Sequence, residues 1–475
     1  MQGKVVNSIT DALRLAGIRD SMTLSFHHHL RNGDYVLNLV MSAVRELGLK
    51  DITINASAIF DCHLPLVELI KDGTVSGLEC NYLGALVGKS ISSGILKKPV
   101  IFRTHGGRPA DLERGSAHID IAFIAAPTAD SQGNISGKYG PSACGSLGYA
   151  FADARYADKV VAVTDNLVPY PLADFSIAET EVDYVVIQDR IGDPGGIVSG
   201  TTRITRDPIG LLMADMAAEA IKASGLLRDG FSFQTGAGGA SLAAAFALEK
   251  IMLKECIQGS FASGGITSQL VNMHKRGCFE TLLDVQCFDL GAVESIRVNP
   301  QHKEISAGHY ASPEAASAVV DSLDAVILGA TEVDLSFNVN VHTNSQGLIM
   351  GGSGGHSDTA AGAKLAIIIA PLMRARMPLI VDRVHTVSTP GDTIDMVVTQ
   401  YGIAVNPRRA DLFDLLRQSR LNIVTIEELK ETAEKICGKP KALNDEDGRI
   451  VAEVHYRDGS IIDTIRHRNH PHTDN

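Results

Sequence analysis

The chain has 475 residues, 45% of them hydrophobic, and a formal net charge of −12 without any basic run. This length predicts about three domains, or two large domains with an extension, and the charge argues against nucleic acid as a partner. Seven cysteines, an odd count without framework spacing, indicate reduced thiols in a cytoplasmic protein. The longest uncharged apolar run, residues 365–373, is too short to span a membrane, and the first residues lack a signal-peptide pattern.

Strand-like and helical patterns alternate through the first part of the chain. Helices are predicted over residues 4–15, 35–47 and 64–72, and strands over 22–26, 52–56, 100–103, 119–126, 159–164 and 182–187, with an Ala-rich segment over 150–157. Such alternation is typical of an α/β fold with a largely parallel sheet. Residues 190–208 are rich in Gly, Asp and Thr, which predicts a linker and a first domain that ends at residue 208.

The second part of the chain has the same alternation. Helices are predicted over residues 209–224, 410–417 and 426–436 and directly after residue 239, and strands over 231–234, 325–328, 333–341, 379–381 and 396–398. Residues 259–266 predict a strand with a Gly-Gly turn, and residues 450–456 and 461–465 predict a small hairpin turned at Asp458-Gly459. The expected domains are therefore 1–208 and 209–438, followed by an extension over 439–475.

A short internal sequence repeat favours two domains of one topology. Residues 130–135 read Asp-Ser-Gln-Gly-Asn-Ile, and residues 344–349 read Asn-Ser-Gln-Gly-Leu-Ile. An apolar run precedes each copy, and a Gly-rich stretch and then an Ala-rich segment follow each. Duplication of one α/β unit is the economical explanation.

The second copy of this repeat is followed by a turn with almost no side chains, residues 351–356. Glycines allow a backbone to approach a ligand closely, and N–H groups at a following helix start suit an anion or an oxyanion. A plain strand-to-helix connection is the simpler alternative. A serine hydrolase or thioesterase is another, because Gly351-x-Ser353-x-Gly355 fits the nucleophile elbow, with Asp382, His385 and His455 downstream.

Basic side chains gather at predicted strand ends in the first domain, where open α/β sheets bind ligands. Arginines there suit a substrate with several carboxylates, through bidentate pairing, although a solvated loop is an equal alternative. The histidines at 27–29 are not expected to share a metal, because successive strand residues point to opposite faces. The candidate substrate-binding set is His28, Arg31, Arg103, His105 and Arg108.

Four segments, residues 234–239, 340–345, 352–358 and 397–404, together with the turn at 130–134, resemble the two-domain α/β coenzyme A transferases. Within that family the chain is similar from end to end to the citrate lyase alpha subunits, and residues 25–34 and 200–208 add to the match. The resemblance implies two topologically similar domains with mainly parallel sheets, plus the small C-terminal hairpin.

The implied activity is that of a citrate CoA-transferase, which converts an acetyl-thioester and citrate into a citryl-thioester and acetate. The thioester would be acetyl-CoA or a CoA-like prosthetic group on an acyl-carrier subunit, with a lyase (beta) subunit as a further partner in a homo- or hetero-oligomer. No tightly bound cofactor or metal is expected. Citramalate is an alternative substrate. The resemblance implies thioester contacts from Gly236, Ala237, Gly238, Gly239, Ser353, Gly355 and His356, and oxyanion stabilisation by Asn344, Gly352 and Gly354.

The chain departs from many relatives at one point. Those relatives carry a catalytic glutamate that forms an enzyme-bound thioester, whereas the matching stretch here, residues 261–266, contains no carboxylate. This implies direct reaction of the two substrates in a ternary complex, through an acyl anhydride. Gly264 and Gly265 are expected to leave room for the acceptor carboxylate.

Overall fold

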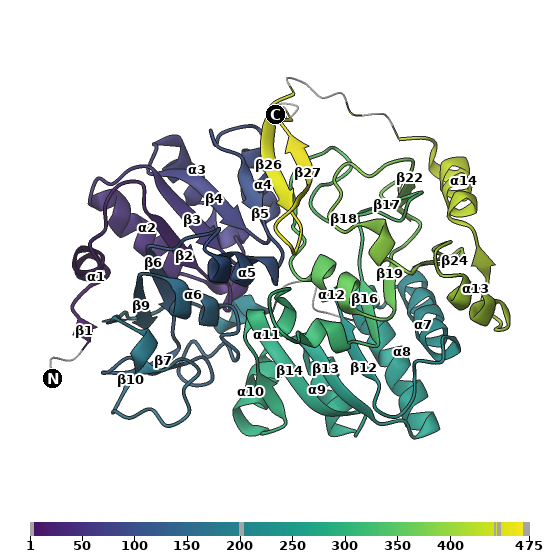
Figure 1. The fold of residues 1–475 in the computed structure, drawn as a ribbon, viewed down its shortest axis with the longest axis horizontal. Coiled ribbons are helices and arrows are strands. Elements are labelled where there is room, and N and C mark those ends of the chain that lie inside the picture. Colours follow the sequence, from purple (N-terminus) through teal and green to yellow (C-terminus); the bar gives the residue numbers. More distant parts are fainter. Residues whose placement is uncertain (1–3, 199–203, 441–442, 444–447, 469–475) are drawn as a thin grey trace.

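The computed structural model describes residues 4–198, 204–440, 443 and 448–468. Figure 1 shows two α/β halves side by side, with the C-terminal hairpin between them. Residues 200–203, part of the segment used above for the resemblance, lie outside the described residues.

The first half is built on a ten-stranded sheet in which every strand pair except the C-terminal hairpin is parallel. In sheet order the strands are β1 (Val5–Val6), β11 (Tyr184–Ile187), β9 (Lys159–Thr164), β6 (Ile121–Ala125), β2 (Thr23–Phe26), β3 (Ile52–Ala56), β4 (Val75–Cys80), β5 (Val100–Phe102), β26 (Ile450–His455) and β27 (Ile461–Arg466). Its helices are α1 (Ile9–Leu15), α2 (Val36–Glu46), α3 (Leu66–Lys71), α4 (Ala85–Ser92), α5 (Gly107–Arg114) and α6 (Ala150–Tyr156).

The second half has a nine-stranded sheet, parallel except for one antiparallel pair, β23 with β24. In sheet order the strands are β15 (His302–Glu304), β14 (Phe279–Cys287), β13 (Gly259–Ile266), β12 (Ser232–Thr235), β16 (Ala325–Leu328), β19 (Ala366–Ile369), β23 (Met396–Thr399), β24 (Gly402–Val405) and β25 (Ile423–Val424). Its helices are α7 (Pro208–Ala223), α8 (Gly239–Glu255), α9 (Ser268–Lys275), α10 (Leu290–Val298), α11 (Ala307–Ala311), α12 (His356–Gly362), α13 (Ala410–Arg417) and α14 (Ile426–Cys437).

The two sheets share one strand order. The run β11-β9-β6-β2-β3-β4-β5 in the first half corresponds to β23-β19-β16-β12-β13-β14-β15 in the second. This confirms the prediction of two topologically similar α/β units with mainly parallel sheets. The boundaries at residues 208 and 438 stay predictions, and the first of them coincides with the start of α7.

A small three-stranded sheet in each half repeats the likeness. One consists of β10 (Leu167–Val168), β7 (Thr128–Asp130) and β8 (Ile135–Ser136), and the other of β22 (Ile380–Val381), β17 (Glu332–Asp334) and β18 (Val339–Asn340). A further hairpin is formed by β20 (Met373–Arg374) and β21 (Met377–Pro378). Short 3-10 helices are η1 (Arg31–Gly33), η2 (Asp61–His63), η3 (Glu179–Glu181), η4 (Pro194–Ile197), η5 (Val319–Ser322) and η6 (Gly391–Thr393).

The structural equivalent of the Asp130 turn is the turn at Asp334, which the sequence repeat did not identify. In both small sheets an aspartate carboxylate closes the turn: Asp130 accepts the side-chain amide of Asn134 at 2.8 Å, and Asp334 accepts that of Asn338 at 3.1 Å. Asn344 forms a similar turn but lies after β18, outside this correspondence. The sequence repeat therefore predicts the local turn at Asn344 correctly, but the position of that turn in the domain topology wrongly.

Three other expectations differ from the structure. The predicted strand 333–341 is the hairpin β17–β18, because Asp334 captures backbone N–H groups in the turn and Phe337 adopts a positive φ. The predicted helix 4–15 begins with strand β1, since Ser8 caps α1 and starts the helix at Ile9. The predicted Gly-Gly turn at 264–265 is a register shift within β13, which continues to Ile266.

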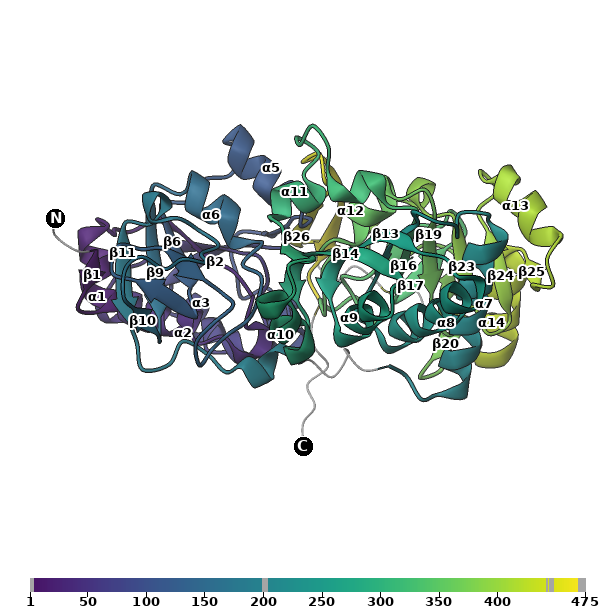
Figure 2. The same ribbon diagram turned by 90° about the horizontal axis from the view of Figure 1, so that it is seen from below.

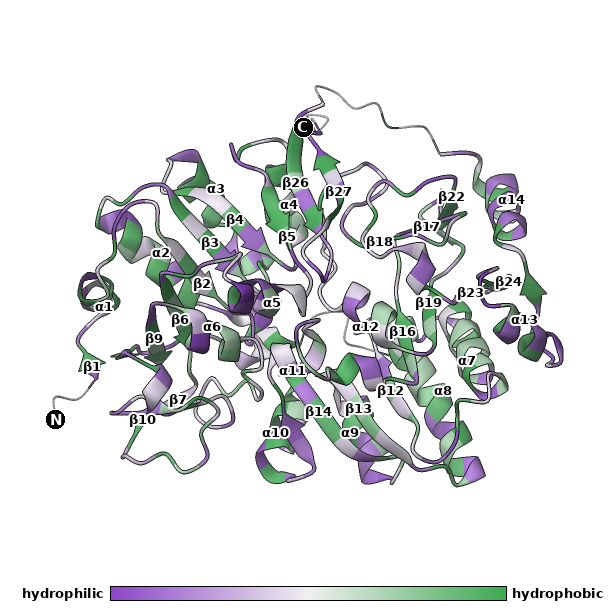
Figure 3. Ribbon diagram, viewed as in Figure 1, coloured by the Kyte–Doolittle hydropathy of each residue, from purple (hydrophilic) through white to green (hydrophobic). Residues whose placement is uncertain are grey.

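The C-terminal hairpin is confirmed, and it returns to the first half. Strand β26 pairs in parallel with β5, with Ala452 opposite Val100, so the end of the chain completes a sheet that the beginning started. Figure 3 shows hydrophobic residues concentrated in the strands and in α7 and α8. Figure 2 shows α5 and α6 on the opposite side of the first sheet from α2 and α3. Within the described residues no helix is long and apolar enough to cross a membrane.

Candidate functional site

The glycine loop of residues 351–355 docks onto the first half where β4 and β5 end. Thr104 forms a parallel β-bridge with Gly354, the His105 N–H donates to the Gly354 carbonyl at 2.8 Å, and the Gly354 N–H donates to the Asn81 carbonyl at 3.1 Å. A side chain at Gly352 would collide with the Asn81 carbonyl. The absence of side chains in the loop is therefore what lets the two halves meet at this point.

The same contacts decide which N–H groups of the loop are available. The Gly354 N–H is used by Asn81, and the Ser353 N–H donates to Nε2 of His342 at 3.3 Å. Among the described residues, no acceptor faces the N–H groups of Gly352 and Gly355. Of the loop donors expected to meet an oxyanion, Gly352 is therefore open and Gly354 is engaged.

Ser353 has no catalytic triad. Its hydroxyl lies 2.7 Å from the hydroxyl of Ser357, and no described histidine or carboxylate contacts its oxygen. The downstream residues that favoured a hydrolase lie elsewhere in pairs: Asp382 with Lys430 at 2.9 Å, His385 with Glu332 at 3.5 Å, and His455 with Glu453 at 3.2 Å. The geometry therefore gives no support to the serine-hydrolase alternative.

Facing the loop is a cluster of buried histidines with Tyr149 at its centre. The Tyr149 ring lies 4.8 Å from the ring of His28 and 4.5 Å from that of His105, and the rings of His27 and His29 are 4.2 Å apart. Burial lowers the pKa of His29 and of His105 to about 3. The cluster is therefore made of neutral imidazoles, which can donate or accept hydrogen bonds but add no charge.

Unpartnered polar atoms concentrate where this cluster meets the second half. Buried polar groups without hydrogen bonds are costly, so a gathering of them indicates a position for ligand or water. The amide of Gln286 donates to the His28 carbonyl at 2.8 Å and joins the two halves. Buried atoms without a hydrogen-bond partner in this region include Nδ1 of His27, both ring nitrogens of His29, Nδ1 of His105, Oδ1 of Asn81 and Asp284, and Oε1 of Gln234 and Gln286.

The space beside Gly264 is filled by a carboxamide. A Cβ built on Gly264 would lie 2.7 Å from Cδ of Gln234, and one built on Gly265 would collide with the ring of Phe288. The Gln234 amide is held by the hydroxyl of Tyr310 at 2.8 Å. The two glycines are thus packed positions rather than the open room expected from the sequence, and a neutral amide stands where a side chain at residue 264 would point.

The five predicted substrate cations fall into two groups. Arg103 is paired with Asp111 at 2.7 Å, and Arg108 is paired with Asp153, so both arginines stabilise the first half and are not free for a substrate. The guanidinium carbon of Arg31 lies 4.5 Å from the centre of the Phe288 ring. A cavity of about 600 Å³ opens there, lined by Arg31, Phe60, Tyr82, Asp193 and neighbouring residues. With His28 and His105, Arg31 belongs to the buried junction.

The remaining predicted residues lie beside the loop. Asn344 accepts the N–H groups of Gln346 and Leu348 at 2.9 and 3.0 Å and lines a separate cavity of about 200 Å³ with Met350 and Arg374. His356 bonds Thr389 at 2.7 Å and the Gly329 carbonyl at 2.9 Å. Asn344 and His356 are therefore anchored by their own surroundings.

The glycines before α8 follow the carboxyl end of β12. The Gly236 N–H donates to the carbonyl of Ile327 in the next strand, Gly238 caps the helix, and Gly239 begins it, with Ala237 between them. This places the segment at the sheet edge where parallel strands end, which is the usual side for a ligand.

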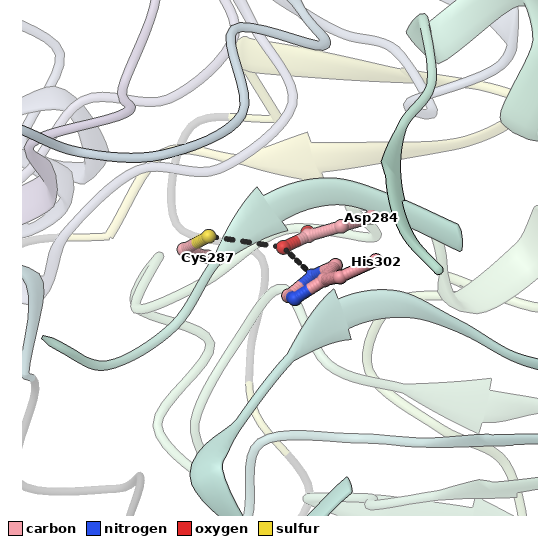
Figure 4. Close-up of side chains that lie close together, drawn as sticks. All are labelled: Asp284, Cys287 and His302. Atoms are coloured by element: carbon pink, nitrogen blue, oxygen red, sulfur yellow. Dashed lines mark hydrogen bonds and ion pairs between the residues drawn. The ribbon is translucent and has the colours of Figure 1, made fainter. Parts of the chain in front are cut away.

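A group that the sequence did not suggest lies next to Gly264, since Asp284 is its partner across the strands. Asp284 accepts from His302 at 2.9 Å and from the Cys287 thiol at 3.0 Å, and all three side chains are buried (Figure 4). Burial, with Asp284 beside it, raises the pKa of the Cys287 thiol. These distances fit direct hydrogen bonds, and they are shorter than the spacing of ligands around a tetrahedral zinc ion, about 3.3 Å or more.

Tyr149, Gln234, Gln286 and Tyr310 are members of the junction that sequence reasoning missed. Gln234 stands in one of the segments that carried the family resemblance, and this could have marked it. The other three are defined by contacts between segments far apart in the chain and have no local signal.

Residues 2–468 match the protein family described as citrate lyase, alpha subunit. The citrate lyase alpha chain of Haemophilus influenzae is 48% identical over 462 residues, which cover 97% of this chain and 92% of that protein. The chain of Escherichia coli K12 is 46% identical over 462 residues, covering 97% and 90%.

Comparison with solved structures gives the same family. A protein from Streptococcus mutans described as a citrate lyase alpha subunit in complex with citrate superposes with a TM-score of 0.97 at 48% identity, covering 99% of this chain and 92% of that one. The alpha subunit of a malonate decarboxylase from Acinetobacter baumannii has a TM-score of 0.67 at 17% identity, covering 93% and 94%. The second likeness supports the fold alone.

Proposed function

Because the chain belongs to the family of citrate lyase alpha subunits, we propose that it is the citrate CoA-transferase of a citrate lyase. This follows the CoA-transferase-type activity of that family. The donor is an acetyl-thioester, either acetyl-CoA or a CoA-like group on an acyl-carrier subunit, and the acceptor is citrate. The lyase (beta) subunit would take the citryl-thioester onward. The citrate-bound relative from Streptococcus mutans supports citrate as the acceptor.

The reaction proceeds without an enzyme-bound thioester. A citrate carboxylate attacks the acetyl carbonyl, a C–O bond forms, the C–S bond breaks, and the thiolate leaves an acetyl-citrate anhydride. The thiolate then attacks the citryl carbonyl of the anhydride, which forms the citryl-thioester and expels acetate. Holding both substrates in one junction supplies much of the acceleration, and the N–H groups of Gly352 and Gly355 would stabilise the oxyanion.

One observation carries the direct mechanism: the carboxamide of Gln234 fills the space beside Gly264. An amide is a far poorer nucleophile than a carboxylate, so this position cannot hold an acyl group. Two buried carboxylates near the junction take part in hydrogen bonds, although Oδ1 of Asp284 has no partner in the described structure. Asp358 accepts the Thr104 hydroxyl at 2.8 Å and the Gly106 N–H at 2.9 Å, and Asp284 is held by Cys287 and His302.

Substrate carboxylates would be bound by Arg31 and by neutral donors rather than by a set of arginines. His28, His29 and His105 lie in the junction. Both ring nitrogens of His29 and the Nδ1 of His105 have no hydrogen-bond partner, whereas the Nδ1 of His28 bonds Ser57 at 2.6 Å. Because these histidines are neutral, they avoid the free-energy cost of burying several charges together.

The test is the transfer reaction itself. The full chain is incubated with acetyl-CoA and citrate, and citryl-CoA and free acetate are measured, with citramalate in a parallel sample. We expect citrate-dependent release of acetate in equal amount to citryl-CoA, and a lower rate with citramalate. Release of acetate and free CoA without citrate would indicate a thioesterase, and no reaction in any sample would contradict a transferase.

A further inference from the structure

One buried carboxamide in the junction has an orientation that its contacts fix. The NH2 group of Gln286, near the end of β14, donates to the backbone carbonyl of His28 at 2.8 Å. A carbonyl oxygen can only accept a hydrogen bond, so the NH2 group faces His28 and Oε1 faces elsewhere. Oε1 is buried and has no hydrogen-bond partner among the described residues. Gln286 therefore presents a hydrogen-bond acceptor to a ligand in the junction.

Two other carboxamides near the junction differ from Gln286. The NH2 group of Gln234 contacts the hydroxyl of Tyr310, and because a hydroxyl can donate as well as accept, this contact does not fix the orientation of the amide. The NH2 group of Asn81 donates to the Thr104 carbonyl. The backbone carbonyl of the same asparagine accepts an N–H of the glycine loop at 3.1 Å, which places this residue beside the loop. Gln286 is thus the acceptor of fixed orientation on the side of the histidine cluster.

The surroundings of Gln286 are the groups proposed to bind the citrate carboxylates. The carbonyl that it contacts belongs to His28, whose ring lies 5.8 Å from that of His105. Two residues further along the chain, the ring of Phe288 lies 4.5 Å from the guanidinium carbon of Arg31. A citrate molecule held by these groups would bring its remaining polar group, the hydroxyl, close to the carboxamide.

We propose that Oε1 of Gln286 accepts a hydrogen bond from the hydroxyl group of citrate and so makes the transferase specific for hydroxylated acceptors. Ionised carboxylates only accept hydrogen bonds, so they cannot satisfy this oxygen, and the hydroxyl is the single donor of fully ionised citrate. A site that pairs a substrate hydroxyl rejects an analogue without it, because its own polar atom is then left unpaired. The inference rests on the proposed transferase function and names the group by which the acceptor is recognised.

The test compares citrate with two analogues that lack the donor. Tricarballylate has hydrogen in place of the hydroxyl, and 3-deoxy-3-fluorocitrate has a fluorine atom there. With the full wild-type chain and acetyl-CoA, we expect kcat/KM to be at least about tenfold lower for both analogues than for citrate. In Gln286→Met this preference should shrink to about twofold or less. The matched control is Gln418→Met, at an exposed glutamine that ends α13, which should keep the wild-type preference.

A second variant covers a failure of Gln286→Met to fold. Gln286→Asn retains the carboxamide but withdraws it by one methylene group, and it should also lose most of the preference for citrate. An unchanged preference in either folded variant would overturn the proposal even if total activity falls, because a structural role, or a contact with the thioester arm, lowers transfer to all three acceptors equally. Equal transfer to the three acceptors by the wild type would overturn it as well, and the transferase function would stand.

If the wild-type chain transfers to none of the acceptors, the proposed function fails instead. Calorimetry then compares the binding of citrate and tricarballylate to the wild type and to the Gln286 variants. Tighter binding of citrate to the wild type, lost in the variants, supports the hydroxyl contact, and equal binding of the two acids to the wild type contradicts it.

Discussion

Each half of the molecule places a glycine-rich loop against the sheet of the other half, and the two contacts differ in charge. Residues 137–148 of the first half meet β14 and β15: Ser146 donates to the Asp284 carbonyl, and the Leu147 N–H donates to the Glu304 carboxylate. Residues 351–355 of the second half meet the equivalent strands β4 and β5, at Asn81 and Thr104.

The difference indicates which contact can serve an anionic substrate. The first loop is held by the carboxylate of Glu304 through the Leu147 N–H, and a carboxylate at this contact would repel citrate. The second faces a carbonyl and neutral histidines, and the aspartate there, Asp358, is turned toward Thr104 and Gly106. One duplicated architecture thus yields a structural junction on one side and a candidate active site on the other.

The largest effect is expected at Gly352. In Gly352→Ala the new methyl group collides with the Asn81 carbonyl and moves the loop, and displacement of about 1 Å can cost about 100-fold in rate. We expect kcat/KM for citrate-dependent transfer to fall by that order. Gly308→Ala is the control, because its nearest neighbour lies 3.8 Å away, and wild-type kinetics are expected there. Unaltered kinetics in Gly352→Ala would show that the loop does not act in transfer.

The second effect concerns the Gln234 amide. Gln234→Glu places a carboxylate where a citrate carboxylate must approach, and like charges oppose binding. We expect kcat/KM to fall at least about tenfold, with Gln418→Glu, an exposed residue at the end of α13, as the control. A variant as active as the wild type would remove Gln234 from the proposed site.

The buried neutral histidines predict that the unfolding free energy decreases in acid. Burial lowers the pKa of His29 to about 3, so between pH 3 and 6.5 the unfolded chain binds a proton that the folded chain does not. The stability contributed by the neutral ring is present above pH 6.5 and is lost as pH falls toward 3. His29→Gln should therefore weaken the slope of unfolding free energy against pH in this window. An unchanged slope would mean that His29 is protonated in the folded protein.

The first loop provides the matching structural variant. Gly145 has a φ of +83° and no space for a side chain beside Cys287. We expect Gly145→Ala to lower the unfolding free energy by about 1–3 kcal/mol, read from urea denaturation, with kcat/KM of the folded fraction unchanged. A large loss of kcat/KM in fully folded Gly145→Ala would place the first loop in catalysis as well.

The smallest effect is expected for Asn344. The Asn344 side chain holds its own turn through Oδ1 and lines the cavity shared with Met350 and Arg374. Asn344→Ala should therefore lower the transfer rate less than about tenfold, below the 100-fold or more that loss of an oxyanion donor costs. A fall of 100-fold without a change in thermal unfolding would restore Asn344 as an oxyanion donor.

The sequence predicted the elements with clear apolar patterns: β3, β9 and α13 lie at the expected residues. It missed β4 and α5, because Ser, Gly and Glu interrupt the apolar pattern of β4, and α5 carries Gly, Pro and charged residues. It identified Arg103 and Arg108 by their position at strand ends. Their partners Asp111 and Asp153 come from helices packed against the sheet, and such pairing is fixed only in three dimensions.

The central claim is that no carboxylate of this chain carries the acyl group. The full protein is incubated with acetyl-CoA without citrate, reduced with borohydride, and digested for mass spectrometry. The direct mechanism predicts that every Asp and Glu side chain keeps its unmodified mass, while the same preparation makes citryl-CoA once citrate is added. An Asp or Glu converted to the corresponding alcohol would reveal an enzyme-bound thioester and contradict the account.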